Sequence, residues 1–404
     1  MIAAAPACAR DIDLLSPATI SASADLRMVA TSGEQPWSTG QFGKLRYGDE
    51  VGPRVGNADL VWRPQFGWAA SATVVASYVG GPHGEPGISE AFFTIRPRLA
   101  GTTRAVARIG LMWAPSSLEH TGADWHVADT ITPSAINSWI GEEVRPLAAE
   151  AKLSFDLAGG RIETTAALFT ANDTAGTLLA LRGWALHDRK TLVGRGQLLP
   201  PLSADVSLIQ PEYTHPTAYL SQGFARHPGT YLKLGWAPAA PVRFEVFHYE
   251  NHGNPDDANA EREWGWRTRF DQIAFEARIG DATRLRAQAL TGRTRMGFAD
   301  DSGRRWVDCY FRSAFGLLSH DFKHGGIALR GEAFATRQAG TLVLADDGET
   351  GWATTFAAHR TLNSHVSLWV EALHVDSDRA ARQRAGQDPH QHQDQLQLVM
   401  RGTW

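Results

Sequence analysis

Residues 150–168 read EAKLSFDLAGGRIETTAAL, and this stretch decides the fold class. From 150 to 157, every apolar residue is followed by a charged or polar one, which is the period of a strand with one apolar face. Gly159 and Gly160 then supply a tight turn, because glycine adopts positive φ freely. Residues 161–168 alternate again. The stretch therefore predicts a β-hairpin.

The same alternation recurs along the whole chain, with no convincing helical stripe longer than about three turns. It predicts about 16 strands (14 to 18), which leaves about 25 of the 404 residues for each strand and its connection. The expected strands are 24–31, 42–48, 58–65, 67–79, 89–97, 104–113, 150–157, 161–168, 178–187, 231–236, 242–247, 264–279, 284–289, 307–315, 326–336, 352–360, 365–375 and 394–404.

The polar faces distinguish a membrane barrel from a soluble sandwich, which also alternates. They carry bulky charges of both signs in mid-strand, and many of the apolar faces begin or end in one of the 14 tryptophans. A water-filled lumen tolerates the charges, and an aromatic girdle explains the tryptophans. We therefore expect an all-β fold, a transmembrane antiparallel up-and-down β-barrel. A net charge of −4 excludes a strongly basic nucleic-acid binder, so no nucleic-acid partner is expected.

The beginning of the sequence favours a processed segment. Ala7-Cys8-Ala9 fits a signal-peptidase pattern, so residues 1–9 are expected to be a signal-peptide remnant and 10–404 a single barrel domain. An ordinary terminus is the alternative, and a lipidated Cys8 fits less well. Cys8 and Cys309 are the only cysteines, which excludes a disulfide framework and a cysteine-based metal knuckle.

The longer connections are expected at 114–149, 188–229, 251–263, 297–305 and 376–393. The first contains SAINSWIGEEVRPLAAEA, which predicts one or two helical turns from Ser134 that end before Pro146. We expect this loop to fold into the lumen. Glu142, Glu143 and Arg145 would then set a transverse field at the narrowest point. An exposed loop helix with ordinary charge pairs is the alternative.

Basic residues recur on the strand faces that we assign to the lumen. A positive ladder there would suit carboxylate or phosphate solutes. The alternative is that these residues pair with Glu150, Glu163, Glu245, Asp271, Asp308 and Glu332 and merely set the field of the pore. The expected pore-lining residues are Arg104, Arg108, Lys233, Arg267, Arg269, Arg284, Arg286, Arg312 and Arg330.

The last eleven residues, DQLQLVMRGTW, place Leu396, Leu398, Met400 and Trp404 on one face. This segment resembles the closing strand of Gram-negative outer-membrane proteins, although Trp stands where Phe is usual. Three further segments resemble porin-like outer-membrane proteins near the phosphate-selective porins O and P. They are ADLRMVATSGEQPWSTGQFGKLRYG, INSWIGEEVRPLAAEAKLSF, and EWGWRTRF followed by LRAQALTGRTRMG.

The resemblance implies a porin in the outer membrane of a Gram-negative bacterium and leaves the solute open. We expect passive diffusion of small hydrophilic solutes, with a mild preference for anions that rests on the basic residues of the lumen faces. The resemblance also implies outer-membrane lipids and lipopolysaccharide as neighbours, reading of the last strand by the barrel-assembly machinery, and a homotrimer. The runner-up is a soluble all-β carbohydrate-binding or glycan-processing protein that uses its tryptophans as stacking platforms.

No catalytic motif is present, and we expect neither an enzyme nor a cofactor. Asp124, His126 and Ser134 could be imagined as a catalytic set on a barrel wall, but nothing in their spacing requires it. The oxygen-rich stretch 254–261 lacks the spacing of a calcium loop, and 388–394 offers only two histidines. Both are expected to be solvated loops, so no metal site is predicted.

Overall fold

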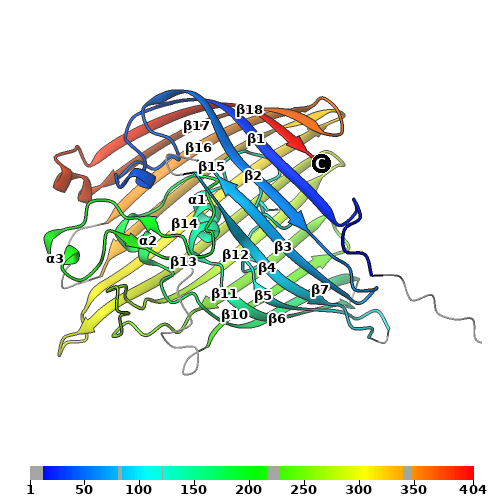
Figure 1. Cartoon of the computed structure of the whole chain (residues 1–404), viewed down its shortest axis with the longest axis horizontal. Helices are drawn as coiled ribbons and strands as arrows, with labels where there is room; N and C mark the ends of the chain where they lie inside the picture. The colour runs from blue at the N-terminus through cyan, green and yellow to red at the C-terminus, as the bar shows by residue number, and fades with distance from the viewer. Residues whose placement is uncertain are drawn as a thin grey trace, which may run out of the picture.

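The computed structural model describes residues 12–80, 84–99, 101–120, 122–157, 159–216, 228–339 and 348–404. The expected signal-peptide remnant at 1–9 lies outside the described residues. Sixteen strands form one closed antiparallel barrel, in which each strand pairs with its neighbours along the chain and the first pairs with the last (Figure 1). The predicted all-β barrel of about 16 strands is confirmed.

The wall consists of β1 (Ile20–Ser32), β2 (Glu50–Trp62), β3 (Ala70–Val79), β4 (Glu85–Ile95), β5 (Arg104–Leu111), β6 (Leu147–Leu157), β7 (Gly160–Thr170), β10 (Gly229–Pro238), β11 (Val242–Glu250), β12 (Arg267–Ile279), β13 (Thr283–Ala299), β14 (Arg305–Phe322), β15 (Gly325–Gln338), β16 (Glu349–Thr361), β17 (Val366–Arg379) and β18 (His390–Thr403). The connections hold η1 (Trp37–Thr39), α1 (Ala135–Glu143), α2 (Thr177–Leu181), β8 (Gln197–Leu198), α3 (Ala204–Ser207), β9 (Tyr213–Thr214) and η2 (Ala380–Ala385).

The hairpin predicted from 150–168 is β6 and β7, which pair from Leu147 opposite Thr170 to Leu157 opposite Gly160. Gly159 has a φ of +75° in the turn, a conformation that a side chain would strain. Two predicted strands are wrong. Residues 42–48 and 178–187 lie inside the molecule and touch through one isolated bridge, Leu45 to Leu186. Their apolar residues are buried in the lumen. Alternation alone cannot distinguish an irregular segment with buried apolar residues from a strand with one apolar face.

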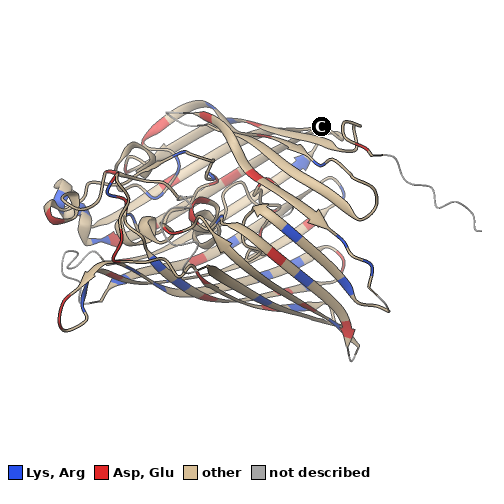
Figure 2. Ribbon diagram, turned by 60° about the horizontal axis from the view of Figure 1, so that its bottom comes forward, with Lys and Arg blue, Asp and Glu red and all other residues tan. Residues whose placement is uncertain are grey.

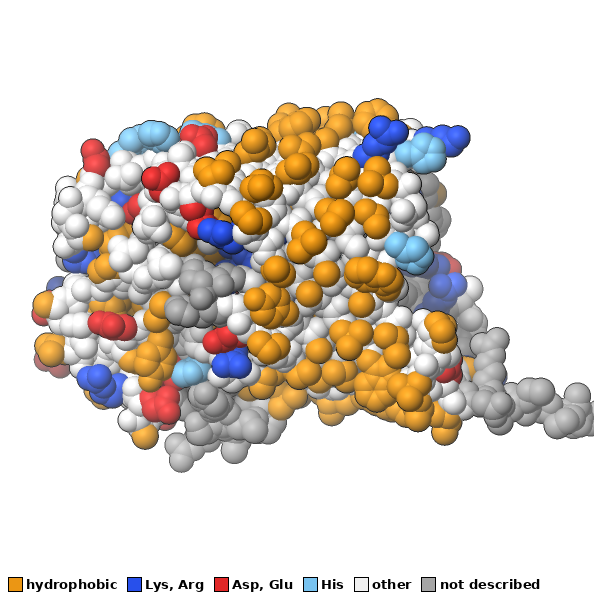
Figure 3. Space-filling view, turned by 45° about the horizontal axis from the view of Figure 1, so that its top comes forward, with side chains coloured by type: hydrophobic (Ala, Val, Ile, Leu, Met, Phe, Trp, Pro, Cys, Tyr) orange, Lys and Arg blue, Asp and Glu red, His pale blue; other side chains and the backbone are white. Residues whose placement is uncertain are grey.

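The outward side chains form an apolar belt, one face of which is seen in Figure 3. On β18, for example, Leu396, Leu398 and Met400 point outward and are about half exposed. Tight turns such as 280–282 and 323–324 join strands at one end, and the long connections gather at the other. In barrels of this kind the long connections are extracellular. Among the described residues, no helix combines the length and the apolar character needed to cross a membrane.

Candidate solute pathway

The interior of the barrel is narrowed by segments that fold inward from the long-connection end. α1 lies within the barrel (Figure 1), and all nine of its residues are buried. Ser134 caps the helix, since its hydroxyl accepts a hydrogen bond from the backbone N–H of Asn137. The predicted inward loop with a short helix from Ser134 is confirmed, and the alternative of an exposed loop helix is wrong. Residues 171–216 and 33–49 add further buried side chains to the interior.

Aromatic packing fixes α1 to one side of the lumen. The ring of Trp139 lies 5.2 Å from that of Phe270 on β12 and 5.3 Å from that of Phe311 on β14. Trp184, from the 171–216 segment, packs edge-on against Trp139 at 6.1 Å. All four residues are nearly inaccessible to solvent. This apolar contact excludes water between α1 and the aromatic side chains of β12 and β14.

Glu142 and Glu143 are neighbours in α1 with opposite environments. Burial opposes ionisation of Glu142, but its ion pair with Arg182 at 2.6 Å and its contact with His187 lower its pKa to about 2. Burial raises the pKa of Glu143 to about 7, although that carboxylate accepts hydrogen bonds from the backbone N–H groups of Gly176 and Leu178. Both side chains thus connect α1 to the 171–216 segment.

Arg145 is also buried, and it also connects the inward segments. Its guanidinium donates to the backbone carbonyl of Ser89 on β4 at 2.6 Å and to that of Thr191 in the 171–216 segment. Burial lowers the pKa of Arg145 to about 9. The three residues predicted to form the constriction therefore hold the inward segments together. Their charges do not face open water, so the transverse-field hypothesis lacks support from their positions.

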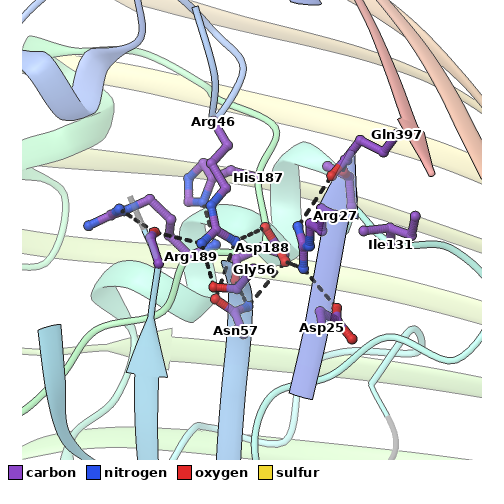
Figure 4. A network of polar contacts seen from close by, with 12 residues as sticks. Asp25, Arg27, Arg46, Gly56, Asn57, Ile131, His187, Asp188, Arg189 and Gln397 are labelled. Carbon is purple, nitrogen blue, oxygen red and sulfur yellow. Dashed lines mark hydrogen bonds and ion pairs between the residues drawn. The ribbon is translucent and has the colours of Figure 1, made fainter. Parts of the chain in front are cut away.

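A cluster of charged side chains lies on the opposite side of the lumen, between β1, β2 and residues 187–190 (Figure 4). Asp188 accepts from both Arg27 on β1 and Arg46 in the 33–49 segment. Asn57 on β2 donates to the backbone carbonyl of Asp188 at 2.8 Å. Burial opposes ionisation of Asp188, yet Arg27 and Arg46 hold its pKa far below the usual range. One carboxylate thus ties an inward segment to the wall.

The cluster continues toward the tight-turn end. Asp25 on β1 pairs with Arg401 on β18 at 2.7 Å, and Lys190 pairs with Asp59 on β2 at 2.7 Å. These side chains line a hollow of about 20 Å³, which is room for one water molecule. His126 lies beside it, 3.1 Å from Arg401.

The charged residues of this cluster were missed in the sequence. Asp25 and Arg27 alternate with Leu26 and Met28 in the predicted strand 24–31, so the alternation rule could have found them. Asp188 and Lys190 lie in an irregular segment, for which the sequence carries no comparable signal.

Six of the nine predicted pore-lining residues lie on inward faces of the barrel, and they are Arg104, Arg108, Lys233, Arg284, Arg286 and Arg330. Arg108 pairs with Glu150 at 2.7 Å, and Lys233 pairs with Glu245 at 2.7 Å. Arg330 is fully buried between Glu119 and Glu332. Among the described residues, five of the six have a carboxylate partner, so the alternative of charge pairing describes these positions better than a free positive ladder.

The other three, Arg267, Arg269 and Arg312, point outward, which corrects the prediction. On β12 the buried, inward residues are Thr268 and Phe270, and on β14 they are Phe311 and Ser313. The prediction assumed that a charged face looks into the lumen. That assumption fails here for two reasons. The inner faces of β12 and β14 are apolar because they pack against α1. At the long-connection end, the outer faces of these strands lie beyond the apolar belt and can carry charge.

The last strand closes the barrel on β1. Its backbone continues the pairing to Trp404, whose N–H donates to Ala22 at 2.9 Å and whose carbonyl accepts from Ala22 at 2.9 Å. The Trp404 side chain is 67% exposed. Leu396, Leu398 and Met400 share its outward face. Reading of this segment by the assembly machinery stays a prediction.

The other candidate groups show little chemistry. The Ser134 hydroxyl donates to Glu119 at 2.6 Å, and His126 lies against Asp124 and Arg401. No contact between Ser134 and His126 is found among the described residues, so the imagined catalytic set is not assembled. In the described part of the chain, one group has metal-ligand spacing, and it consists of His215, Glu261 and Glu263 in the long connections.

Comparison with known proteins gives the fold. The outer membrane channel DcaP of Acinetobacter baumannii is 9% identical over 97% of this chain and 99% of that one, with a TM-score of 0.57. An anion-selective porin from Comamonas acidovorans is 11% identical over 96% and 99%, with a TM-score of 0.51. The trimer form of OmpT, an outer membrane protein of Vibrio cholerae, is 8% identical over 96% and 99%, with a TM-score of 0.50.

No protein-family model and no curated protein matches the sequence. The structural likeness at these identities shows that the chain has the fold of the outer-membrane porins, in agreement with the resemblance found in the sequence.

Proposed function

We propose that this protein is an outer-membrane channel of a Gram-negative bacterium, through which small hydrophilic solutes diffuse without chemical change. The observation that carries the proposal is the closed barrel with an apolar belt outside and a charged cluster inside. The exposed belt argues against the soluble carbohydrate-binding alternative, because water-exposed apolar surface of that extent is unfavourable. The proposal includes no enzymatic step.

We propose that the route runs along the charged cluster, past Asp25, Asp188 and Arg401, because aromatic side chains of β12 and β14 pack against α1 on the other side. The hollow there holds about one water and is lined by residues of β1, β2 and β18, of 125–133 and of 188–190, so we propose that larger solutes pass when the 188–190 part of this lining moves. That segment is held to the wall by the ion pairs of Asp188 and Lys190. We propose that these pairs set how often the channel opens.

Ion selectivity is expected to be weak. Arg108, Lys233 and Arg330 each face a carboxylate on the inner wall, so their charges largely cancel. One of the structurally similar proteins is an anion-selective porin, but its selectivity belongs to that protein. The mild anion preference expected from the sequence is therefore the weaker part of the proposal. A homotrimer fits the trimer form of one neighbour.

The test is conductance in planar bilayers for the wild type and for Asp188→Asn. The substitution removes the charge that holds Arg27 and Arg46, so the 171–216 segment is expected to open more often and the mean conductance to rise. Asp271→Asn is the matched control, because Asp271 points outward and is exposed. Folded protein that conducts in neither form would refute the proposal.

A further inference from the structure

Six outward arginines that do not line the pore form one patch at the long-connection end of β12–β15. It comprises Arg267, Arg269, Arg293, Arg295, Arg312 and Arg337. Arg267 lies directly opposite Arg295, and Arg269 lies directly opposite Arg293. Like charges in opposed positions destabilise a sheet. The patch therefore favours an anion that would offset this repulsion.

The carboxylates nearby do not neutralise the patch. Glu250 pairs with Arg267 at 2.8 Å, and Asp308 pairs with Arg293. Among the described residues, no ion pair joins a carboxylate to the remaining four, Arg269, Arg295, Arg312 and Arg337.

Two hollows open between these arginines. The first has a volume of about 520 Å³ and is lined by Arg312 on β14 and Arg337 on β15, together with Tyr310, Thr350 on β16 and the carboxylate of Asp378 on β17. The guanidinium groups of Arg293 and Arg337 lie 4.8 and 5.0 Å from the centre of the Tyr310 ring, which holds them in place.

The second hollow measures about 320 Å³. It is lined by Arg267, Arg295 and Arg305 together with His252 and Asp256. Arg305 pairs with Asp256, so a positive charge remains toward the hollow from Arg295. Each hollow thus presents guanidinium groups, whose planar donors match phosphate oxygens.

Below the arginines the outer wall is lined by small side chains. Two rows cross β13, β14 and β15 in register, and they are Ala289, Ala314 and Ala333, then Ala287, Gly316 and Gly331. A Cβ atom added at Gly316 or Gly331 would meet nothing within 4 Å. The wall here is a shallow apolar trough that leads away from the arginines into the belt.

We propose that this face binds one phosphorylated glycolipid of the outer leaflet, of the lipopolysaccharide class. Its phosphates would occupy the two hollows, and its acyl chains would lie in the trough. The position supports a lipid occupant, because the arginines stand where the apolar belt meets the long, extracellular connections. The inference shares with the proposed function only the placement in an outer membrane, and it does not depend on conduction.

The test is binding of diphosphorylated lipid A to the full-length protein in lipid-free detergent, measured by native mass spectrometry. The variant Arg312→Gln/Arg337→Gln is expected to bind about tenfold more weakly than the wild type. Arg360→Gln is the matched control, because Arg360 also points outward but lies at the tight-turn end of β16, and its binding should equal that of the wild type.

Two further arms identify the source of the phosphate. Dephosphorylated lipid A should bind the wild type as weakly as the diphosphorylated lipid binds the double variant, and inorganic phosphate alone should not compete at millimolar concentration. Equal binding of the two lipids, or equal binding by the double variant, would overturn the inference. So would a change in oligomeric state of the double variant with unchanged lipid binding, which would assign the face to a second copy of the chain.

Heat-modifiable migration on a gel shows that each variant is folded. Conductance separates this inference from the proposed function. A wild type that binds the lipid but does not conduct contradicts only the channel, and one that conducts without binding the lipid contradicts only this site.

Discussion

β14 and β18 are both long strands of the same barrel, and they have opposite polarity. On β18 the inward residues are polar, such as Gln395 and Gln397, and the outward ones are apolar, such as Leu398. On the half of β14 nearer the long connections, the inward residues are aromatic, such as Phe311, and the outward ones include Arg312. Charges of both signs are spread along the strands of the wall (Figure 2), so charge alone does not show which face looks inward.

The difference shows that the inner neighbour sets the polarity of a strand face. β18 faces the charged cluster, where Gln397 contacts Arg27 at 3.3 Å. β14 faces α1, where Phe311 packs against Trp139. A strand that lines water needs polar side chains inward, whereas a strand that covers a buried helix needs apolar ones there. Four predictions follow from this difference in the order of their expected size.

The largest effect is expected from Phe311→Ala. Phe311 is 2% exposed between α1 and the wall, so its truncation leaves a cavity and should cost about 3–5 kcal/mol of folding free energy. Phe356→Ala on β16 is the matched control, because Phe356 points outward and is 47% exposed. Its loss should cost well under half as much. Urea unfolding in lipid vesicles measures both. Equal losses would mean that the inner face of β14 is not a packed core.

Leu398→Arg tests the apolar outer face of β18. Leu398 points into the apolar belt and is 55% exposed, so a charge there has no water and should cost about 2–4 kcal/mol. Gln397→Arg, one residue earlier and directed inward, is the control and should cost less, because Glu371 lies within reach at 3.4 Å. The same unfolding measurement compares them. A smaller loss of folding free energy for Leu398→Arg than for Gln397→Arg would contradict the assigned faces.

The two carboxylates of α1 make the stability depend on pH in opposite directions. Folding raises the pKa of Glu143 to about 7, so stability from this group is full below its ordinary pKa near 4.5 and is lost as the pH rises toward 7. Folding lowers the pKa of Glu142 to about 2, so its contribution is full above about 4.5 and is lost as the pH falls toward 2.

Glu143→Gln should therefore remove the decline in stability between pH 4.5 and 7, a change of about 3 kcal/mol, while the loss of stability at acid pH stays unchanged. Glu142→Gln is the matched neighbour. It should reduce the loss of stability between pH 4.5 and 2. It should also destabilise the protein at pH 7, because Arg182 would lose its charged partner. The midpoint of the heat-modifiable transition against pH measures both, and identical profiles for the two variants would contradict the assigned environments.

The barrel could be predicted from the sequence because every strand repeats the same local rule, and the rule needs no knowledge of distant contacts. The inward helix was also predictable, since Ser134 and Pro146 mark its limits locally. The faces of Arg267, Arg269 and Arg312 were not, because their orientation depends on α1, which lies more than a hundred residues away in the sequence. The link from Asp188 to Arg27 joins residues 161 positions apart, and no local pattern encodes such a pairing.

The smallest effect is expected from Arg312→Glu. This variant tests directly whether the outer face of β14 is separate from the solute route. Arg312 is exposed on the outer wall, with Phe311 and the packed helix between it and the interior, so two units of charge can change there without altering the field along the solute route. The reversal potential under a salt gradient should equal that of the wild type. Arg104→Glu is the counterpart, because Arg104 is exposed on the inward face of β5 at the tight-turn mouth. The same charge change there should shift the reversal potential toward cation selectivity by several millivolts, since the mouth is open to water and close to the passing ions. A shift for Arg312→Glu that matched the shift for Arg104→Glu would place the outer arginines in the permeation path and remove the distinction between the two faces of β14.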